Sequence, residues 1–181
     1  MYLMLVLLLF SCAGYSGPPL PPQEPRPAMP NGLDEDQREY LAAHNALRKK
    51  KGVPPLVYDL KLEAFAKKWS EHLASTVGGC RLQHSQAPHQ GENLAMYYGA
   101  RNLSPMEVFN MWAREEKDFD YATNSCTAGE VCGHYTQLVW STTKRVGCSW
   151  AICLDPGKWK QKTIYTCSYH PPGNIRGHKP Y

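Results

Sequence analysis

The sequence predicts a single domain of the α+β class, with helices first and a β-hairpin near its C-terminal end. Three observations carry this prediction. Capping residues precede stretches in which apolar side chains recur at helical spacing, and two runs of β-branched and aromatic residues flank a turn sequence. In addition, 43% of the 181 residues are hydrophobic, and this length and composition fit one domain with its own core.

The first two predicted helices each begin after an aspartate. Asp34 can cap the first helix, because Gln37 follows three residues later as in a capping box. Gly52 and the prolines that follow it end this helix. Asp59 can cap the second helix, whose apolar residues form one wide face. That face consists of Leu62, Phe65, Ala66, Trp69 and Leu73.

The third predicted helix has the clearest start. Ser104 supplies a capping hydroxyl, Pro105 occupies the first helical position and Glu107 the third. One stripe of this helix carries Val108, Met111, Trp112, Glu115 and Phe119. Glu115 therefore lies on the apolar side, where a carboxylate must be paired or hydrogen-bonded. The alternative is that the edge of the stripe curves and leaves Glu115 half exposed.

A buried helix is predicted to begin at residues 133–140, and the hairpin follows it. His134 stands in this helix where an apolar residue is expected, so its imidazole needs a partner. Residues 145–153 and 163–169 are rich in β-branched and aromatic side chains and are separated by Asp155-Pro156-Gly157, which predicts two strands and a turn.

Four side chains that can bind metals are expected to converge. His84, Glu92 and Glu115 lie in sequence contexts typical of packed rather than solvated residues, as His134 does. A cluster of two imidazoles and two carboxylates is therefore the first candidate for a functional site.

The N-terminal 32 residues are predicted to precede the folded domain. Residues 1–16 contain an uncharged apolar run, too short for the roughly 20 residues that span a bilayer, and are interpreted as a signal peptide. An alternative reading of residues 9–12 is a lipoprotein cleavage box that leaves Cys12 as a lipid anchor. Residues 17–32 hold 7 of the 15 prolines and predict a semi-rigid linker. The domain is expected to cover residues 33–181, and the leader predicts a secreted, extracellular protein.

The charge distribution argues against nucleic-acid binding. The formal net charge is +4 with a pI near 8.6, and residues 48–51 form the only run of basic side chains. Such a run is typical of a solvated helix end, where cations interact favourably with the helix dipole. We expect a monomer that binds no nucleic acid.

Six of the seven cysteines remain after removal of the leader, and an even number in an exported chain predicts three disulfides. A zinc-finger site is disfavoured because the sequence contains no Cys-x2-Cys pair. The six cysteines are Cys80, Cys126, Cys132, Cys148, Cys153 and Cys167. Composition alone leaves all 15 pairings open.

Four sequence motifs in a fixed order carry a family resemblance. They are Gly-His-Tyr-Thr-Gln-Leu-Val-Trp-Ser-Thr-Thr at 133–143, Ile-Tyr-Thr-Cys-Ser-Tyr-His-Pro-Pro-Gly-Asn-Ile at 164–175, His-Asn-Ala-Leu-Arg at 44–48 and Gly-Glu-Asn-Leu at 91–94. Together they resemble the CAP superfamily of cysteine-rich secretory proteins, antigen 5 and pathogenesis-related 1 proteins, and most of all its plant-type pathogenesis-related 1 members. The resemblance implies an α-β-α sandwich with a small antiparallel sheet between helical layers. It also implies disulfides Cys80–Cys153, Cys126–Cys132 and Cys148–Cys167.

The resemblance also assigns roles to the four candidate site residues. It places His84, Glu92, Glu115 and His134 around one cavity, with His84 and His134 as ligands of a weakly held Zn²⁺, and assigns no catalytic residue. Two nitrogens alone make an incomplete zinc site. From the residues alone His44 is interpreted as a helix-surface residue, whereas the resemblance implies that its motif is structural, with Asn45 and Arg48 organising backbone. His44 is therefore placed outside the site.

Three functions are compatible with this resemblance. The first is a defence module that binds a sterol or other lipid through an aromatic loop containing Phe119 and Tyr121, in contact with a membrane surface. The second is a metal-dependent hydrolase with Glu92 or Glu115 as general base. The third is a precursor that releases residues 171–181 as a signalling peptide, although Ser168 replaces an asparagine of the family's processing motif.

Overall fold

The computed structural model describes residues 32–75, 79–99, 101–153 and 161–181. The predicted leader, nearly all of the linker and the hairpin turn lie outside these residues. The secondary-structure elements, in chain order, are α1 (Glu35–Lys50), β1 (Val57–Tyr58), α2 (Leu60–Ala74), β2 (Gly91–Gly99), α3 (Pro105–Ala113), the 3₁₀ helix η1 (Arg114–Asp118), β3 (Phe119–Asp120), β4 (Ser125–Cys126), α4 (Gly133–Leu138), β5 (Arg145–Ile152) and β6 (Gln161–His170).

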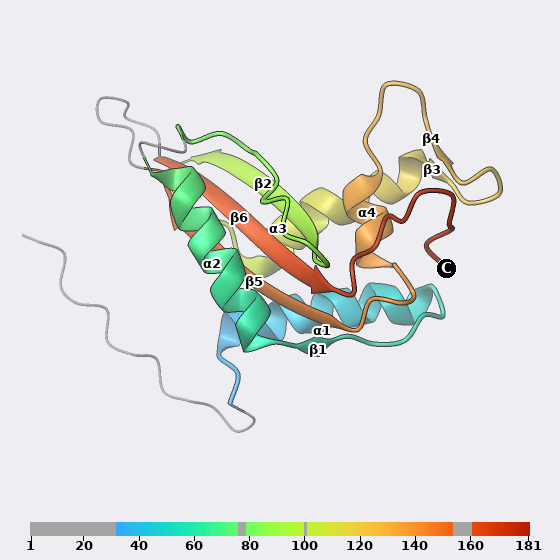
Figure 1. Ribbon diagram of the computed structural model, residues 1–181, viewed down its shortest axis with the longest axis horizontal. Helices are drawn as coiled ribbons and strands as arrows, with labels where there is room; N and C mark the ends of the chain where they lie inside the picture. The colour runs from blue at the N-terminus through green and yellow to red at the C-terminus, as the bar shows by residue number, and fades with distance from the viewer. Residues whose placement is uncertain (1–31, 76–78, 100, 154–160) are drawn as a thin grey trace, which may run out of the picture.

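The expected α-β-α sandwich is confirmed (Figure 1). The central sheet has the strand order β1-β5-β6-β2, and it is antiparallel except for the two-residue β1, which runs parallel to β5. Ser70 of α2 donates to Thr166, whereas His44 of α1 contacts Tyr169. Because side chains alternate along a strand, Thr166 and Tyr169 of β6 point to opposite faces. Helix α2 therefore covers one face, and α1 lies on the other with α3 and α4 (Figure 1).

The predicted helix starts are confirmed. Asp34 and Gln37 form the capping box of α1, and Ser104 and Glu107 form that of α3. Asp59 caps α2 by accepting bonds from the backbone of Lys61 and Leu62. The predicted end of the third helix is wrong, because the α-helix stops at Ala113 and continues as η1. Glu115 lies in η1, and its side chain is 14% exposed rather than half exposed.

The position of Arg48 contradicts the prediction that the whole basic run at residues 48–51 is solvated. Residues 49 and 50 are exposed as expected, but the side chain of Arg48 is fully buried. Its guanidinium donates to four backbone carbonyls, those of Pro54 (2.7 Å), Leu138 (2.9 Å), Trp140 (3.0 Å) and Thr143 (3.0 Å). Arg48 therefore ties α1 to the C-terminal end of α4, and desolvation lowers its pKa to about 10. The expected role in organising backbone is confirmed.

His44 is also buried, so its interpretation as a helix-surface residue is wrong. The Nδ1 atom donates to the Tyr40 carbonyl (2.7 Å), which leaves Nε2 to accept from the hydroxyl of Tyr169 (3.0 Å). Burial lowers the pKa of His44 from 6.5 to about 4. The imidazole is therefore neutral and forms part of the packing between α1 and the sheet.

The depressed pKa of His44 predicts a pH-dependent stability. Between pH 6.5 and about 4 the unfolded chain binds a proton at His44 that the folded protein does not, so stability falls as the pH falls. We expect His44 to account for a loss of about 3 kcal/mol across this window. Urea unfolding at stepped pH should show a flatter profile for His44→Gln than for wild type. The exposed His178→Gln serves as control, and identical profiles for all three proteins would exclude this role.

All three disulfides have the pairing that the resemblance implied, Cys80–Cys153, Cys126–Cys132 and Cys148–Cys167. The first joins the segment after α2 to the end of β5, and the last joins directly opposed residues of β5 and β6. Such bonds are typical of an oxidising compartment. Within the described residues, no helix is long and apolar enough to cross a membrane.

Candidate functional site

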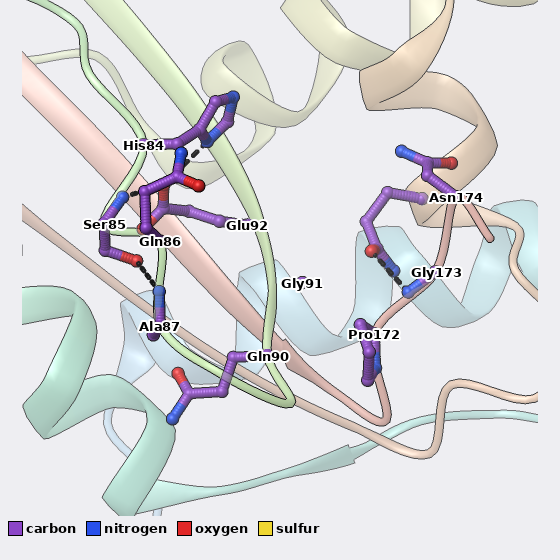
Figure 2. A pocket seen from close by; sticks show the side chains of 11 residues that line it. His84, Ser85, Gln86, Ala87, Gln90, Gly91, Glu92, Pro172, Gly173 and Asn174 are labelled. Atoms are coloured by element: carbon purple, nitrogen blue, oxygen red, sulfur yellow. Dashed lines mark hydrogen bonds and ion pairs between the residues drawn. The ribbon is translucent and has the colours of Figure 1, made fainter. Parts of the chain in front are cut away.

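His84 and Glu92 form the first of two histidine–glutamate pairs. The Nδ1 atom of His84 lies 2.7 Å from Oε1 of Glu92, which also accepts from the backbone N–H of Ser85 at 3.1 Å (Figure 2). Glu92 projects from the start of β2, and its side chain is only 7% exposed, whereas that of His84 is 56% exposed. The carboxylate therefore fixes one ring nitrogen of a histidine that reaches solvent.

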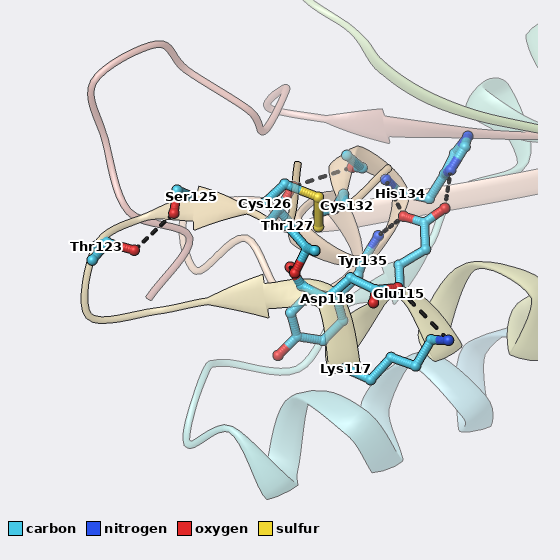
Figure 3. The surroundings of a disulfide bond; sticks show 12 residues. Glu115, Lys117, Asp118, Thr123, Ser125, Cys126, Thr127, Cys132, His134 and Tyr135 are labelled. Carbon is cyan, nitrogen blue, oxygen red and sulfur yellow. Dashed lines mark hydrogen bonds and ion pairs between the residues drawn. A yellow bond between two sulfur atoms is a disulfide. The ribbon is translucent and has the colours of Figure 1, made fainter. Parts of the chain in front are cut away.

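His134 and Glu115 form the second pair, at the start of α4. Oε1 of Glu115 lies 2.6 Å from Nδ1 of His134, and Oε2 accepts from the backbone N–H groups of His134 (3.0 Å) and Tyr135 (3.1 Å), as Figure 3 shows. The carboxylate thus also satisfies N–H groups that a helix start leaves unpaired. The Trp112 ring stacks on His134 with centroids 6.3 Å apart. The prediction that Glu115 is hydrogen-bonded is confirmed.

The four candidate residues form two pairs, and the structure does not assemble them into a closed metal site. Among the described residues, no three histidine, cysteine, aspartate or glutamate side chains lie together as metal ligands would. Each histidine uses Nδ1 for its carboxylate, so Nε2 is the nitrogen that remains for a metal, as in many zinc proteins. The glutamates therefore fit the role of orienting the histidines, and the histidines fit that of ligands in an incomplete site.

The two carboxylates differ in what they could do chemically. Both oxygens of Glu115 already accept hydrogen bonds. Oε2 of Glu92 is buried and has no hydrogen-bond partner within the part of the chain that the structure describes. Of the two candidate general bases, Glu92 is therefore the one with an oxygen not already engaged by an N–H group of the described residues.

A polar pocket of about 330 Å³ lies beside His84 and Glu92 (Figure 2). On its other side Gln137 of α4 accepts from the backbone N–H of Gly173 at 2.9 Å and donates to Thr143 at 3.2 Å. A Cβ atom on Gly91 would lie 2.2 Å from Oε1 of Gln137, so a larger residue at position 91 would displace the Gln137 side chain from this packing.

Sequence reasoning missed Gln137 and Asn93 as residues that shape the site. Asn93 donates to the His134 carbonyl (3.1 Å) and to the Tyr169 hydroxyl (3.4 Å), which links β2 to α4. Both residues are buried and polar, and both stand inside the quoted motifs. The signal that could have identified them is an amide side chain inside a segment predicted to be buried, because a buried amide needs hydrogen-bond partners.

The predicted aromatic loop connects η1 to α4 and carries Phe119 and Tyr121. The partly buried Phe119 ring lies 5.9 Å from that of Tyr135, and Tyr121 is 40% exposed. A groove of about 330 Å³ is lined by residues of the loop, of α4 and of the C-terminal segment 171–181. The apolar side chains of this groove belong to Phe119, Trp140, Ile175 and Pro180. Of the two predicted loop residues, Phe119 lines this groove and Tyr121 does not.

The fold and these sites define a disulfide-bonded α-β-α sandwich domain with two histidine–glutamate pairs and a separate apolar groove. A family profile described as CAP, cysteine-rich secretory protein family, matches residues 41–169. The chain belongs to this family.

Its relatives include pathogenesis-related proteins of plants. It is 39% identical over 152 residues to pathogenesis-related protein PRMS of Zea mays, and the aligned region covers 84% of this chain and 86% of the relative. It is 42% identical over 144 residues to a PR-1 type protein of Sambucus nigra, covering 80% and 81%. Pathogenesis-related protein 1 of Arabidopsis thaliana is 40% identical over 153 residues, covering 84% and 87%.

Solved structures show the same fold. Venom allergen-like protein 4 of Schistosoma mansoni superposes with a TM-score of 0.61 at 25% identity, covering 82% of this chain and 95% of that one. The structure of NaASP2 with Zn²⁺ gives a TM-score of 0.58 at 21% identity and covers 86% of this chain and 90% of that one.

Proposed function

We propose that this protein is a secreted, defence-related module that binds a sterol or other lipid at its aromatic loop. The observation that carries the proposal is the groove beside Phe119, because it combines apolar side chains from the loop, from Trp140 just after α4 and from the C-terminal segment. Burying apolar ligand surface there contributes roughly 25 cal/mol per Å². The partly exposed Tyr121 ring, with its polar hydroxyl, is suited to the boundary between a membrane and water.

Secretion is supported by the sequence of the leader and by the disulfides. Three disulfides in a domain of this size are typical of proteins that fold in an oxidising compartment. The proposal places the protein outside the cell as a monomer that contacts a membrane surface and binds no nucleic acid.

A weakly bound Zn²⁺ is proposed as a second ligand, held by Nε2 of His84 and Nε2 of His134. The two glutamates would orient the rings through Nδ1, and the donor set suits zinc. When bound, the ion supplies Lewis-acid chemistry. The lipid groove has its own residues, so lipid binding is expected not to require the metal.

Paired double variants test this proposal. Replacing Phe119 and Tyr121 by alanine should weaken binding of the fluorescent sterol dehydroergosterol by roughly tenfold or more, because each aromatic ring contributes on the order of 1 kcal/mol or above. His84→Ala with His134→Ala should keep sterol affinity within about twofold and abolish Zn²⁺ binding in a calorimetric titration.

The opposite pattern would overturn the assignment. Sterol binding that is lost in the histidine variant and kept in the aromatic variant would place the ligand at the histidines. Absence of any sterol or phospholipid binding by the wild-type protein, with its disulfides intact, would remove the lipid-binding function altogether.

A further inference from the structure

The ring of Tyr121 is in contact with the C-terminal segment. Tyr181 stacks on it with ring centroids 4.6 Å apart and planes inclined by 12°, and the Lys179 ammonium lies 4.4 Å from its centroid. The Tyr121 hydroxyl donates to the Tyr181 carbonyl. The side chain that the lipid proposal needs therefore already has two partners from this segment.

Further bonds extend this contact along the loop. Asn124 donates to the His178 carbonyl at 3.1 Å, and the Lys179 ammonium donates to the Ala122 carbonyl at 3.2 Å. Residues 178–181 thus bind the loop at three successive points. Contacts of this kind between exposed groups are individually weak and can open without unfolding the domain.

The start of the segment is attached more firmly. The backbone N–H of Gly173 donates to the buried Gln137. The Asn174 side chain accepts from the Thr136 hydroxyl (2.7 Å) and donates to the Gly133 carbonyl (2.8 Å). Residues 174–179 are exposed between this attachment and Pro180, whose carbonyl accepts from Ser141 at 2.7 Å. The segment therefore has a fixed start on α4. At its far end Pro180 is buried and the hydroxyl of the partly buried Tyr181 also lies 3.1 Å from that of Tyr135, whereas the contacts of Lys179 with the loop are exposed.

We propose that the side chains of Lys179 and Tyr181 are a latch on the aromatic loop, and that they must leave the Tyr121 ring before a lipid can use it, while Pro180 stays in the wall of the groove. The proposal rests on the lipid-binding function and adds a regulatory contact to it. Lipid and latch compete for one ring, so the observed lipid affinity equals the affinity of the open form reduced by the fraction of molecules that are open.

The test uses the full chain with Lys179 and Tyr181 both replaced by alanine. One aromatic pair and one exposed cation–π contact together predict a rise of roughly tenfold in dehydroergosterol affinity. Hydrogen exchange of residues 119–124, measured without lipid, should accelerate by a similar factor. Because Lys179 is exposed, Lys179→Ala alone keeps the domain folded and should give roughly a threefold rise.

Tyr98→Ala is the matched control. Tyr98 is an exposed tyrosine with the Lys162 ammonium 5.6 Å from its ring centroid, and it lies on β2 rather than on the loop. This variant should change neither sterol affinity nor loop exchange. An effect equal to that of the latch variants would show that losing any tyrosine–lysine pair changes sterol affinity and loop exchange, and would contradict a specific latch.

The outcomes separate the latch from the lipid function. Unchanged loop exchange in both latch variants overturns the latch, as does a fall in sterol affinity, which would show that Lys179 and Tyr181 support the lipid site rather than cover it. If neither wild type nor variants bind sterol, the lipid function fails, and the exchange data alone decide whether Lys179 and Tyr181 hold the loop closed.

Discussion

Replacing Cys80 and Cys153 together by alanine is expected to lower the free energy of unfolding by about 4 kcal/mol. This disulfide joins residues 73 apart in sequence, so its loss frees a long loop in the unfolded chain. The bond between Cys126 and Cys132 spans only 6 residues, and its removal by the same substitutions should cost about 2 kcal/mol. Urea unfolding under oxidising conditions measures both losses.

The order of the two disulfide effects is the decisive result. The Cys126→Ala and Cys132→Ala protein is the matched control, since it removes the same atoms from a shorter loop. Equal losses from the two pairs would show that packing around the sulfurs, rather than loop length, determines their contribution. The sterol assay on the short-loop variant would show separately whether this bond supports the aromatic loop.

Arg48→Met is expected to lower the free energy of unfolding by about 3 to 5 kcal/mol. Methionine retains much of the apolar length of arginine, but it leaves four backbone carbonyls without this donor. Arg48→Lys should lose nearly as much, because one ammonium cannot reproduce the planar fork of the guanidinium. Lys49→Met is the control, since its exposed side chain predicts a change within about 0.5 kcal/mol.

A small loss in Arg48→Met would contradict this account and would mean that water or a shifted backbone satisfies the carbonyls. The unfolding slope in urea should stay constant among the three variants, because the surface exposed on unfolding does not change. A changed slope would indicate an altered native state rather than the loss of one set of bonds.

Local sequence signals predicted the helix starts well, whereas the pairing of strands far apart in the sequence became known only from the structure. The capping boxes at Asp34 and Ser104 depend on residues three positions apart, so the sequence contains them entirely. Strand β2 was missed because it has three buried residues in a row and no simple alternation, and its partner β6 begins more than 60 residues later.

The candidate site shows the same division. Periodicity predicted that Glu115 needs a partner, and the family resemblance pointed to His134. Neither indicated that Nδ1 of each histidine is the atom bound by its carboxylate, because ring orientation depends on tertiary packing. Arg48 was misread because a basic run has the same local pattern whether its first residue is buried or solvated.

The bonds of Arg48 also have a consequence for biosynthesis. Leu138, whose carbonyl accepts one of them, follows Arg48 by 90 residues. At about 5 to 20 residues per second, a ribosome needs on the order of 5 to 20 s to add them. Until then the Pro54 carbonyl is the one native acceptor available to the guanidinium, so α1 emerges long before it can dock. The geometry around His134 therefore forms late, when almost the whole chain is present, and the domain completes its folding as one unit rather than helix by helix.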